Sequence, residues 1–316
     1  MKVLLTGITG NLGYEVYRDL IGRGIEVVPC IRAGKTDFLS LHGIKTDQLL
    51  VCDLVGEDLM DFSYKVDCIV HCAGDIQFKN EAKNNERMMV RVVGLARKIS
   101  VPIYFASTAF LYKPNQTSGF NNNYELDKFN AEQVLIASRI PHTIFRPSIL
   151  VGNSQNGEII NFSGYYSIVK AFLAVTKKSL ERNRPFRFPK MTGKSNLIPV
   201  DQAAKCLGDI IASKQLGKTL YVVNPEPPQC DWVFDETLKF FGIRQNILEP
   251  EISFDEFVKN DLTEEEQAFA KYAMHFLPYW SLGYSFPESI CTSNLVVHNY
   301  LNKALTYFAN KSQINQ

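Results

Sequence analysis

The chain has 316 residues, 46% of them hydrophobic, and a formal net charge of +1. This composition supports a large core, whereas the near-zero charge excludes the global field by which a basic protein attracts nucleic acid or anionic lipid. No apolar run reaches the roughly 18 residues of a membrane-spanning helix, so we expect no transmembrane segment. The seven cysteines are irregularly spaced, which argues against a disulfide framework and favours a cytoplasmic protein.

The first two-thirds of the chain alternate between apolar, β-branched runs and segments with a helical period. The runs predict strands near residues 2–7, 25–32, 49–54, 66–74, 101–108 and 141–150. Helices are predicted near residues 13–24, 84–99 and 124–139. Strands that alternate with crossover helices predict an α/β fold with a doubly wound parallel (Rossmann) sheet of about seven strands.

The alternation stops after Leu150, where a loop rich in Gly, Asn and Ser begins. We therefore predict a Rossmann domain from residues 1–150 and about 195–228. The remaining residues, about 151–194 and 229–316, would form a smaller, mainly helical and discontinuous lobe. Its aromatic residues form either an acyl channel or a plain hydrophobic core, and they include Phe276, Tyr279, Trp280 and Tyr284.

The stretch "DCIVHCAG" brings Cys68, His71 and Cys72 close together in sequence. Side chains alternate across a strand, so Cys68 and Cys72 face one side and His71 faces the other. We therefore expect no metal site here.

A glycine-rich turn, "TGITGNLG", joins the first predicted strand to the first helix. In such a turn the first glycine allows the tight bend, the second lets the backbone approach a pyrophosphate, and the third lets helix pack on strand. The helix N-terminus adds free amide donors and positive partial charge. We expect a dinucleotide to be bound by Gly7, Thr9, Gly10, Asn11, Leu12 and Gly13.

The end of the second strand carries Arg32, where an NAD-binding chain has an acidic residue for the ribose 2′-hydroxyl. A cation there, assisted by Lys35, can pair with the 2′-phosphate of NADP, which favours NADP over NAD. After the third strand, Asp53 and Leu54 approach the adenine, although Asp53 could equally cap the strand end. The Rossmann domain is thus predicted to bind NADP, which leaves the second lobe for the substrate.

The stretch "YELDKFNAE" places Tyr124 and Lys128 four residues apart on one face of a predicted helix. By itself this pair is either a solvated pair of side chains or a proton-transfer device. The motifs around it, in order, are the glycine turn, "HCAGD", "FASTAFLY" and the Tyr-x-x-x-Lys pair. Together they resemble the extended short-chain dehydrogenase/reductase superfamily over nearly the whole chain.

This resemblance implies a role for each matching residue. Tyr124 would exchange a proton with the substrate, and Lys128 would hold the nicotinamide ribose and draw the phenol pKa down. Thr108 would be the hydroxyl partner, with Ser107 as the fallback. Asn85 aligns with the proton-relay asparagine, although Met88 and Met89 replace the usual Gly-Thr after it. The cofactor would also be bordered by Cys72, Ala73, Gly74, Pro147 and Ser148.

A finer resemblance lies in "FRPSILVGNSQNGEIINFSGYYSIVKAF", which is similar to fatty acyl-CoA reductases and carrier-bound thioester reductases. It implies that NADPH reduces an acyl thioester to an aldehyde or alcohol. The residues implied to border the substrate are Ser107, Ala109, Phe110, Gly152 and Tyr165. The alternatives are a ketone or aldehyde reductase, a nucleotide-sugar epimerase or dehydratase, and a non-catalytic NADP-binding regulatory protein.

The segment from Lys177 to Lys194 has seven basic residues against one Glu. It would meet the phosphates of coenzyme A or the acidic face of an acyl carrier protein, or it is an ordinary solvated loop. No nucleic acid partner is expected. The resemblance also implies a homodimer through the helices at 84–99 and 124–139.

Overall fold

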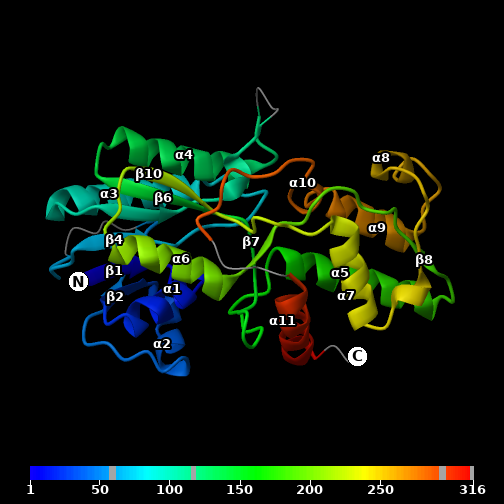
Figure 1. The fold of residues 1–316 in the computed structure, drawn as a ribbon, viewed down its shortest axis with the longest axis horizontal. Coiled ribbons are helices and arrows are strands. Elements are labelled where there is room, and N and C mark those ends of the chain that lie inside the picture. The colour runs from blue at the N-terminus through cyan, green and yellow to red at the C-terminus, as the bar shows by residue number, and fades with distance from the viewer. Residues whose placement is uncertain (57–61, 115–118, 292–296, 314–316) are drawn as a thin grey trace. The chain divides into compact units, whose positions relative to one another are not determined.

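The computed structural model describes residues 1–56, 62–114, 119–291 and 297–313, and its elements are drawn in Figure 1. The chain divides into two units. Unit 1 contains Met1–Ser148, Val200–Val223 and Phe286–Thr292, and unit 2 contains Ile149–Pro199, Asn224–Ser285 and Ser293–Gln316. The segment that begins at Phe286 differs from the sequence-based prediction, which placed all residues from 229 onward in the second lobe.

Unit 1 is built on a seven-stranded sheet in which neighbouring strands all run parallel, in the order β10-β6-β5-β4-β1-β2-β3. The strands are β1 (Lys2–Thr6), β2 (Glu26–Ile31), β3 (Leu50–Val51), β4 (Cys68–His71), β5 (Ile103–Ala106), β6 (His142–Pro147) and β10 (Lys218–Val222). The central strands β4 and β5 are buried throughout, as their apolar sequences predict. The predicted doubly wound parallel sheet is therefore confirmed.

Helices cover both faces of this sheet, and Figure 1 shows α3 and α4 on one face and α1 and α6 on the other. α3 buries Met89, Val92 and Ala96, which are spaced three and four residues apart, in one cluster with Phe105 of β5. The larger of these side chains, Met89, Val92 and Phe105, each contribute about 1.5–3 kcal/mol of burial free energy. The helices of unit 1 are α1 (Asn11–Gly22), α2 (Asp37–Leu41), α3 (Asn84–Ile99), α4 (Asn123–Ala137) and α6 (Val200–Ala212).

Unit 2 is mainly helical, as predicted from the aromatic-rich sequence after Trp232. Two small parallel pairs of strands accompany its helices: β7 (Ile149–Val151) with β9 (Leu197–Pro199), and β8 (Phe186–Arg187) with β11 (Ile247–Leu248). The helices are α5 (Tyr165–Glu181), α7 (Cys230–Phe240), α8 (Phe254–Phe257), α9 (Glu264–Ala273), α10 (Leu277–Trp280) and α11 (Val297–Ser312). Within the described ranges, no helix has both the length and the apolar character needed to cross a membrane.

The single strand predicted near 141–150 is in fact two strands. β6 ends at Pro147, and the backbone N–H of Ser148 donates to Val222 O at 3.1 Å. The next N–H, of Ile149, donates instead to Asn196 O at 3.2 Å, which starts the pairing of β7 with β9. The chain therefore changes sheets within one residue, a switch that its continuous apolar sequence does not reveal.

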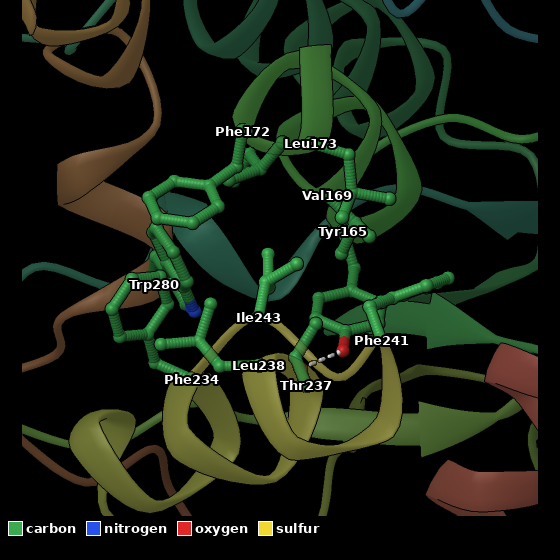
Figure 2. Close-up of a pocket in the computed structure, with 11 residues that line it drawn as sticks. Tyr165, Val169, Phe172, Leu173, Phe234, Thr237, Leu238, Phe241, Ile243 and Trp280 are labelled. Carbon is green, nitrogen blue, oxygen red and sulfur yellow. Dashed lines mark hydrogen bonds between the residues drawn. The ribbon is translucent and has the colours of Figure 1, made fainter. Parts of the chain in front are cut away.

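An aromatic core fills the space between α5 and α7 in unit 2 (Figure 2). Phe172 meets Phe234 edge-on, with ring centroids 5.0 Å apart, and Trp280 is only 3% exposed. The cavity among these side chains has a volume of about 10 Å³, which is room for about one water molecule. These contacts favour the hydrophobic-core interpretation of Trp280 over an acyl channel.

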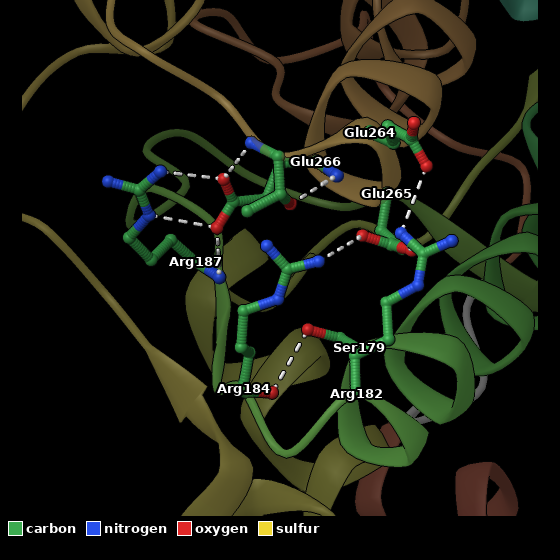
Figure 3. A network of polar contacts seen from close by, with 8 residues as sticks. Ser179, Arg182, Arg184, Arg187, Glu264, Glu265 and Glu266 are labelled. Atoms are coloured by element: carbon green, nitrogen blue, oxygen red, sulfur yellow. Dashed lines mark hydrogen bonds and ion pairs between the residues drawn. The ribbon is translucent and has the colours of Figure 1, made fainter.

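A network of ion pairs joins the end of α5 and β8 to the start of α9 (Figure 3). Arg182 contacts Glu264 at 2.9 Å and Glu265 at 2.6 Å, and Arg187 contacts Glu266 at 2.7 Å. Glu265 and Glu266 are buried, so these guanidinium groups compensate carboxylates that would otherwise be costly to desolvate.

One disulfide joins Cys206 of α6 to Cys291, with Cα atoms 6.0 Å apart, and the other five cysteines are not disulfide-bonded. The residues before Cys291 lie against β10, where Ile290 N donates to Tyr221 O at 3.0 Å and Ser289 Oγ donates to Val223 O at 2.6 Å. The cysteine spacing gave no sign of this bond, because its two residues are 85 positions apart.

We expect Cys206→Ser to lower the melting temperature by roughly 5–10 °C, because losing a disulfide that closes a long loop typically costs 2–4 kcal/mol. Calorimetry with and without a reducing agent measures this. The reductant should lower the wild-type melting temperature to that of the variant and leave the variant unchanged. Equal melting temperatures for both proteins in the absence of reductant would contradict the prediction.

Candidate active site

The glycine turn after β1 has the geometry that a pyrophosphate site requires. Gly7 has φ +78°, and a Cβ there would lie 2.3 Å from Ala73 N. A Cβ on Gly13 would lie 2.1 Å from Gly7 O, so only glycine lets α1 approach the strand this closely. At Gly10 a Cβ would meet only Gly7 O, at 3.3 Å. The surface above Gly10, at the N-terminus of α1, is therefore open to an anion.

The remaining residues of the turn complete this N-terminus. Thr9 and Asn11 are partly exposed beside Gly10, and Leu12 points into the core with 7% of its surface exposed. The turn thus divides into a polar outer side and an apolar inner side. This arrangement fits a dinucleotide pyrophosphate.

The ends of β2 and β3 carry the residues predicted to bind the adenosine. The side chains of Arg32 and Lys35 are exposed and, among the described residues, form no ion pair. Asp53 Oδ1 accepts a hydrogen bond from Val55 N at 3.1 Å, so this residue caps the turn after β3, and Leu54 is buried in the core. Contact of Asp53 with adenine stays a prediction.

At the end of β4, a buried polar contact holds the loop that carries Cys72, Ala73 and Gly74. Thr6 Oγ1 hydrogen-bonds His71 Nδ1 at 2.7 Å and accepts from Ala73 N at 3.2 Å. Burial lowers the pKa of His71 to about 3, so its imidazole is neutral and structural. In the part of the chain that the structure describes, no cluster of three or more His, Cys, Asp or Glu side chains could hold a metal.

Thr108, Tyr124 and Lys128 meet beyond the C-terminal end of β5. The Thr108 hydroxyl hydrogen-bonds the Tyr124 phenol, and Lys128 Nζ donates to Ala106 O at 3.0 Å. Lys128 also lies over the Phe105 ring, 5.0 Å from its centroid, and is 4% exposed. The structure therefore brings together the three residues that the motifs singled out.

Helix α4 positions Tyr124 through its own N-terminus. Asn122 caps the helix, with Oδ1 accepting from Glu125 N at 3.1 Å. A cap of this kind contributes about 1 kcal/mol. It fixes the first turn, in which Tyr124 is the second residue.

Ser107, the fallback for Thr108, has a buried hydroxyl with no hydrogen-bond partner among the described residues. Its backbone N–H donates to Phe145 O at 2.7 Å, so the strand end is fixed while the hydroxyl is left unpaired. Such a buried hydroxyl is expected to bind a polar group of a ligand. Ala109 and Phe110 follow in a 3₁₀ turn and are buried, with Phe110 packed edge-on against Phe286.

Both the amide oxygen and the amide nitrogen of the Asn85 side chain have hydrogen-bond partners in the surrounding structure. Its Oδ1 accepts from Asp75 N at 3.0 Å, and its Nδ2 donates to Asp75 O at 2.9 Å and to Asp127 Oδ2 at 2.8 Å. Asp127 also accepts from the backbone N–H groups of Asn85 and Glu86 at the start of α3. Sequence reasoning missed Asp127 and Asp75, because their partners lie on other elements. A proton-relay role for Asn85 stays a prediction.

The four remaining predicted residues have clear structural roles. Pro147 and Ser148 end β6 in unit 1. In unit 2, a Cβ on Gly152 would lie 2.1 Å from Gly157 O, so close packing accounts for this glycine. The Tyr165 hydroxyl hydrogen-bonds Thr237 Oγ1 at 2.5 Å in the core. Contact of Gly152 or Tyr165 with substrate stays a prediction.

Comparison with solved structures shows the fold. The chain resembles a thiolation-reductase di-domain from an archaeal non-ribosomal peptide synthetase, with 17% identity, a TM-score of 0.72, and coverage of 99% of this chain and 75% of that one. It also resembles the terminal R domain of the myxalamid PKS-NRPS pathway (17% identity, TM-score 0.68, coverage 99% and 92%). UDP-N-acetylglucosamine 4-epimerase from Bacillus cereus is similar too (18% identity, TM-score 0.62, coverage 98% and 99%).

Comparison by sequence identifies the family. No curated protein matches the chain. The model of the NAD dependent epimerase/dehydratase family matches residues 3–170, which is more than half of the 316 residues. This range includes the glycine turn and the Thr108, Tyr124 and Lys128 set. The chain therefore belongs to the NAD dependent epimerase/dehydratase family and is an NAD(P)-dependent enzyme of the extended short-chain dehydrogenase/reductase type.

Proposed function

We propose that the chain is an NADPH-dependent reductase of an acyl thioester, bound to coenzyme A or to a carrier protein. The observation that carries this proposal is the hydrogen bond between the Thr108 hydroxyl and the half-buried Tyr124 phenol, with the buried Lys128 beside them at the end of β5. The likeness to the thiolation-reductase di-domain and to the R domain supports a thioester as the substrate.

The glycine turn would hold the pyrophosphate, and Arg32 with Lys35 would hold the 2′-phosphate. Lys128 would hold the nicotinamide ribose, and Ser107 offers its unpaired hydroxyl to the same region. When bound, NADPH supplies the hydride. The residues of the chain bind it, orient it and handle the proton.

Burial raises the pKa of Tyr124 to about 12, while its hydrogen bond with Thr108 acts in the opposite direction. Desolvation of the phenolate is the largest of these effects, and the expectation that Lys128 and the nicotinamide draw this pKa down stays a prediction. Tyr124 is therefore a neutral phenol near pH 7, ready to donate a proton to a carbonyl oxygen as negative charge develops there.

Reduction of a thioester then follows from these positions. The phenol of Tyr124 and the hydroxyl of Thr108 stabilise the oxygen of the reacting carbonyl. A hydride supplied to the carbonyl carbon would form a C–H bond and place negative charge on this oxygen. As the C=O bond re-forms, the carbon–sulfur bond would break, the thiolate would take up a proton from solvent to give a thiol, and the carbon would become an aldehyde. A second reduction, in which Tyr124 donates its proton to the aldehyde oxygen, gives an alcohol.

The basic segment from Lys177 to Lys194 has fewer available charges than its sequence indicates. Arg182, Arg184 and Arg187 pair with glutamates of α9, and Lys190 pairs with Asp231 at 3.4 Å. Lys177 and Lys178 are exposed on α5 and form no ion pair within the described residues. We infer that these two lysines would contact the phosphates of coenzyme A or an acidic carrier protein. A homodimer through α3 and α4 stays a prediction.

A second candidate is an epimerase or a reductase of ketones and aldehydes. The family description and the likeness to a UDP-N-acetylglucosamine 4-epimerase favour it. Arg32 argues against an epimerase, because an acidic residue at this place selects NAD.

The first experiment follows NADPH oxidation with acyl-CoA thioesters, the matching aldehydes, ketones and UDP-sugars. We expect thioester-dependent oxidation that Tyr124→Phe lowers about 10²- to 10⁴-fold, because the proton donor is lost. Tyr64→Phe is the matched control, since this phenol donates to Leu49 O outside the site. Turnover of ketones or UDP-sugars without turnover of thioesters or aldehydes would support the second candidate instead.

Arg32→Ala should weaken NADPH binding roughly 10- to 150-fold, which is the loss of a charge-assisted contact of about 1.5–3 kcal/mol. NADH binding should change less than about twofold, because NADH has no 2′-phosphate. Fluorescence titration of both cofactors measures the difference. Arg87→Ala, at an exposed arginine of α3, is the control. Equal losses for both cofactors would contradict the assignment of Arg32 to the 2′-phosphate.

The pH dependence of kcat/KM should follow the protonation state of the Lys128 amine. Burial lowers its pKa to about 8, while Cys72, Asp127, Glu132 and Asp75 act in the opposite direction. The ammonium is thus present below about pH 8 and is lost as the pH rises through this value. We expect kcat/KM to fall there with the loss of one proton.

Lys128→Met should remove most of the activity and also the fall of kcat/KM near pH 8. Lys271→Met, at an exposed lysine of α9, should keep the wild-type pH profile. A wild-type profile that is flat to pH 10 would show that the Lys128 charge is not required.

A further inference from the structure

The loop between β4 and α3, residues 74–83, is held in one shape by the carboxylate of Asp75. Its Oδ2 accepts from Asn80 Nδ2 at 2.5 Å and from Asn84 Nδ2 at 2.8 Å, and its Oδ1 accepts from Gln77 N at 3.0 Å. In a loop, side-chain hydrogen bonds of this kind take the place of the backbone hydrogen bonds that hold a helix or a sheet. The hydrogen bonds to Asp75 therefore hold the loop backbone in one conformation.

The loop of residues 74–83 packs directly against the start of α4. Phe78 O accepts a hydrogen bond from Asn123 N at 3.2 Å, one residue before Tyr124. The Phe78 ring is tilted by 39° against the Tyr124 ring, with centroids 6.1 Å apart. Phe78 is thus an immediate neighbour of the phenol and comes from a segment that no motif singled out.

A carbonyl oxygen that receives the Tyr124 proton must come within about 2.6–3.2 Å of the phenol oxygen. The groups attached to that carbonyl carbon would then lie near the phenol ring, and the Phe78 ring, with its centroid 6.1 Å from that of Tyr124, would be one of their neighbours. A phenyl ring offers no hydrogen bond, so it favours an apolar group over the hydroxyls of a sugar. Ile76, two residues earlier, is 54% exposed and adds apolar surface to the same loop.

We infer that Phe78 is a specificity-determining residue that selects apolar, unbranched groups next to the reacting carbonyl. The inference rests on the proposed role of Tyr124 as the proton donor. It deepens the proposed function by naming the kind of acyl group that the site accepts. Steric selection by such a neighbouring side chain is worth about 10- to 200-fold in kcat/KM for a small change in shape.

The test compares linear hexanal with branched 2-ethylhexanal, so that no thioester carrier is needed. We expect the wild-type enzyme to prefer hexanal, and Phe78→Ala to reduce that preference about tenfold or more, with the KM for NADPH unchanged within twofold. Phe78→Leu keeps an apolar side chain without a flat ring, so it should give an intermediate preference. It also decides the question if the alanine variant does not fold.

The matched control is Phe120→Ala, because the Phe120 ring packs on Phe129, with centroids 5.1 Å apart. This variant should keep the wild-type preference. An unchanged preference in folded Phe78 variants would overturn the inference while Tyr124→Phe, if inactive, still supports the proposed function. Full activity of Tyr124→Phe would overturn both. A wild-type enzyme that oxidises NADPH with thioesters but reduces neither aldehyde would overturn the inference and leave the proposed function standing.

Discussion

The site depends on the burial of one ammonium group. Lys128 is 4% exposed and forms no ion pair in the described part of the chain. Taking a charge out of water costs several kcal/mol, and the nearby carboxylates of Asp127, Glu132 and Asp75 offset part of this cost. Ala106 O accepts a hydrogen bond from Lys128 Nζ at 3.0 Å, and the Phe105 ring contributes about 0.5–2 kcal/mol. The position is also tight, because a Cβ on Gly74 would lie 3.0 Å from Nζ. The ends of β4 and β5 are therefore shaped around this lysine.

A second network couples the same helix to the loop beside the substrate. Asp127, the neighbour of Lys128, caps α3 and holds Asn85, and Asn85 in turn binds both backbone groups of Asp75. Asp75 then fixes the loop that carries Phe78. These contacts run without interruption from the catalytic helix to the loop, and buried polar networks with all members satisfied are rigid. The helix that carries Tyr124, the proposed proton donor, and the loop that carries Phe78 are thus held together by one set of hydrogen bonds.

The sequence predicted what depends on local patterns. The helix predicted at 84–99 matches α3, because its apolar residues recur every three or four positions, and the parallel sheet follows from alternating strands and helices. It could not predict what depends on distant partners. The Cys206–Cys291 bond, the return of the chain to unit 1 at Phe286 and the pairing of Asp127 with Asn85 each join residues far apart in sequence. The ion pairs of Arg182 and Arg187 with α9 are likewise contacts between residues far apart in sequence, while contact of the basic segment with coenzyme A or a carrier protein stays a proposal.

The protonation state of Tyr124 bears on the direction of the chemistry. A phenol whose pKa is raised to about 12 is ionised in only about one molecule in 10⁵ at pH 7. An enzyme that begins by oxidising an alcohol needs the phenolate as a base, whereas one that reduces a carbonyl needs the phenol as an acid. Burial thus favours reduction from the resting state. Arg32 points the same way, because NADP is the cofactor that a cation at the end of β2 selects. The Tyr124 phenol and Arg32 are thus two separate features that support the proposal of a reductase.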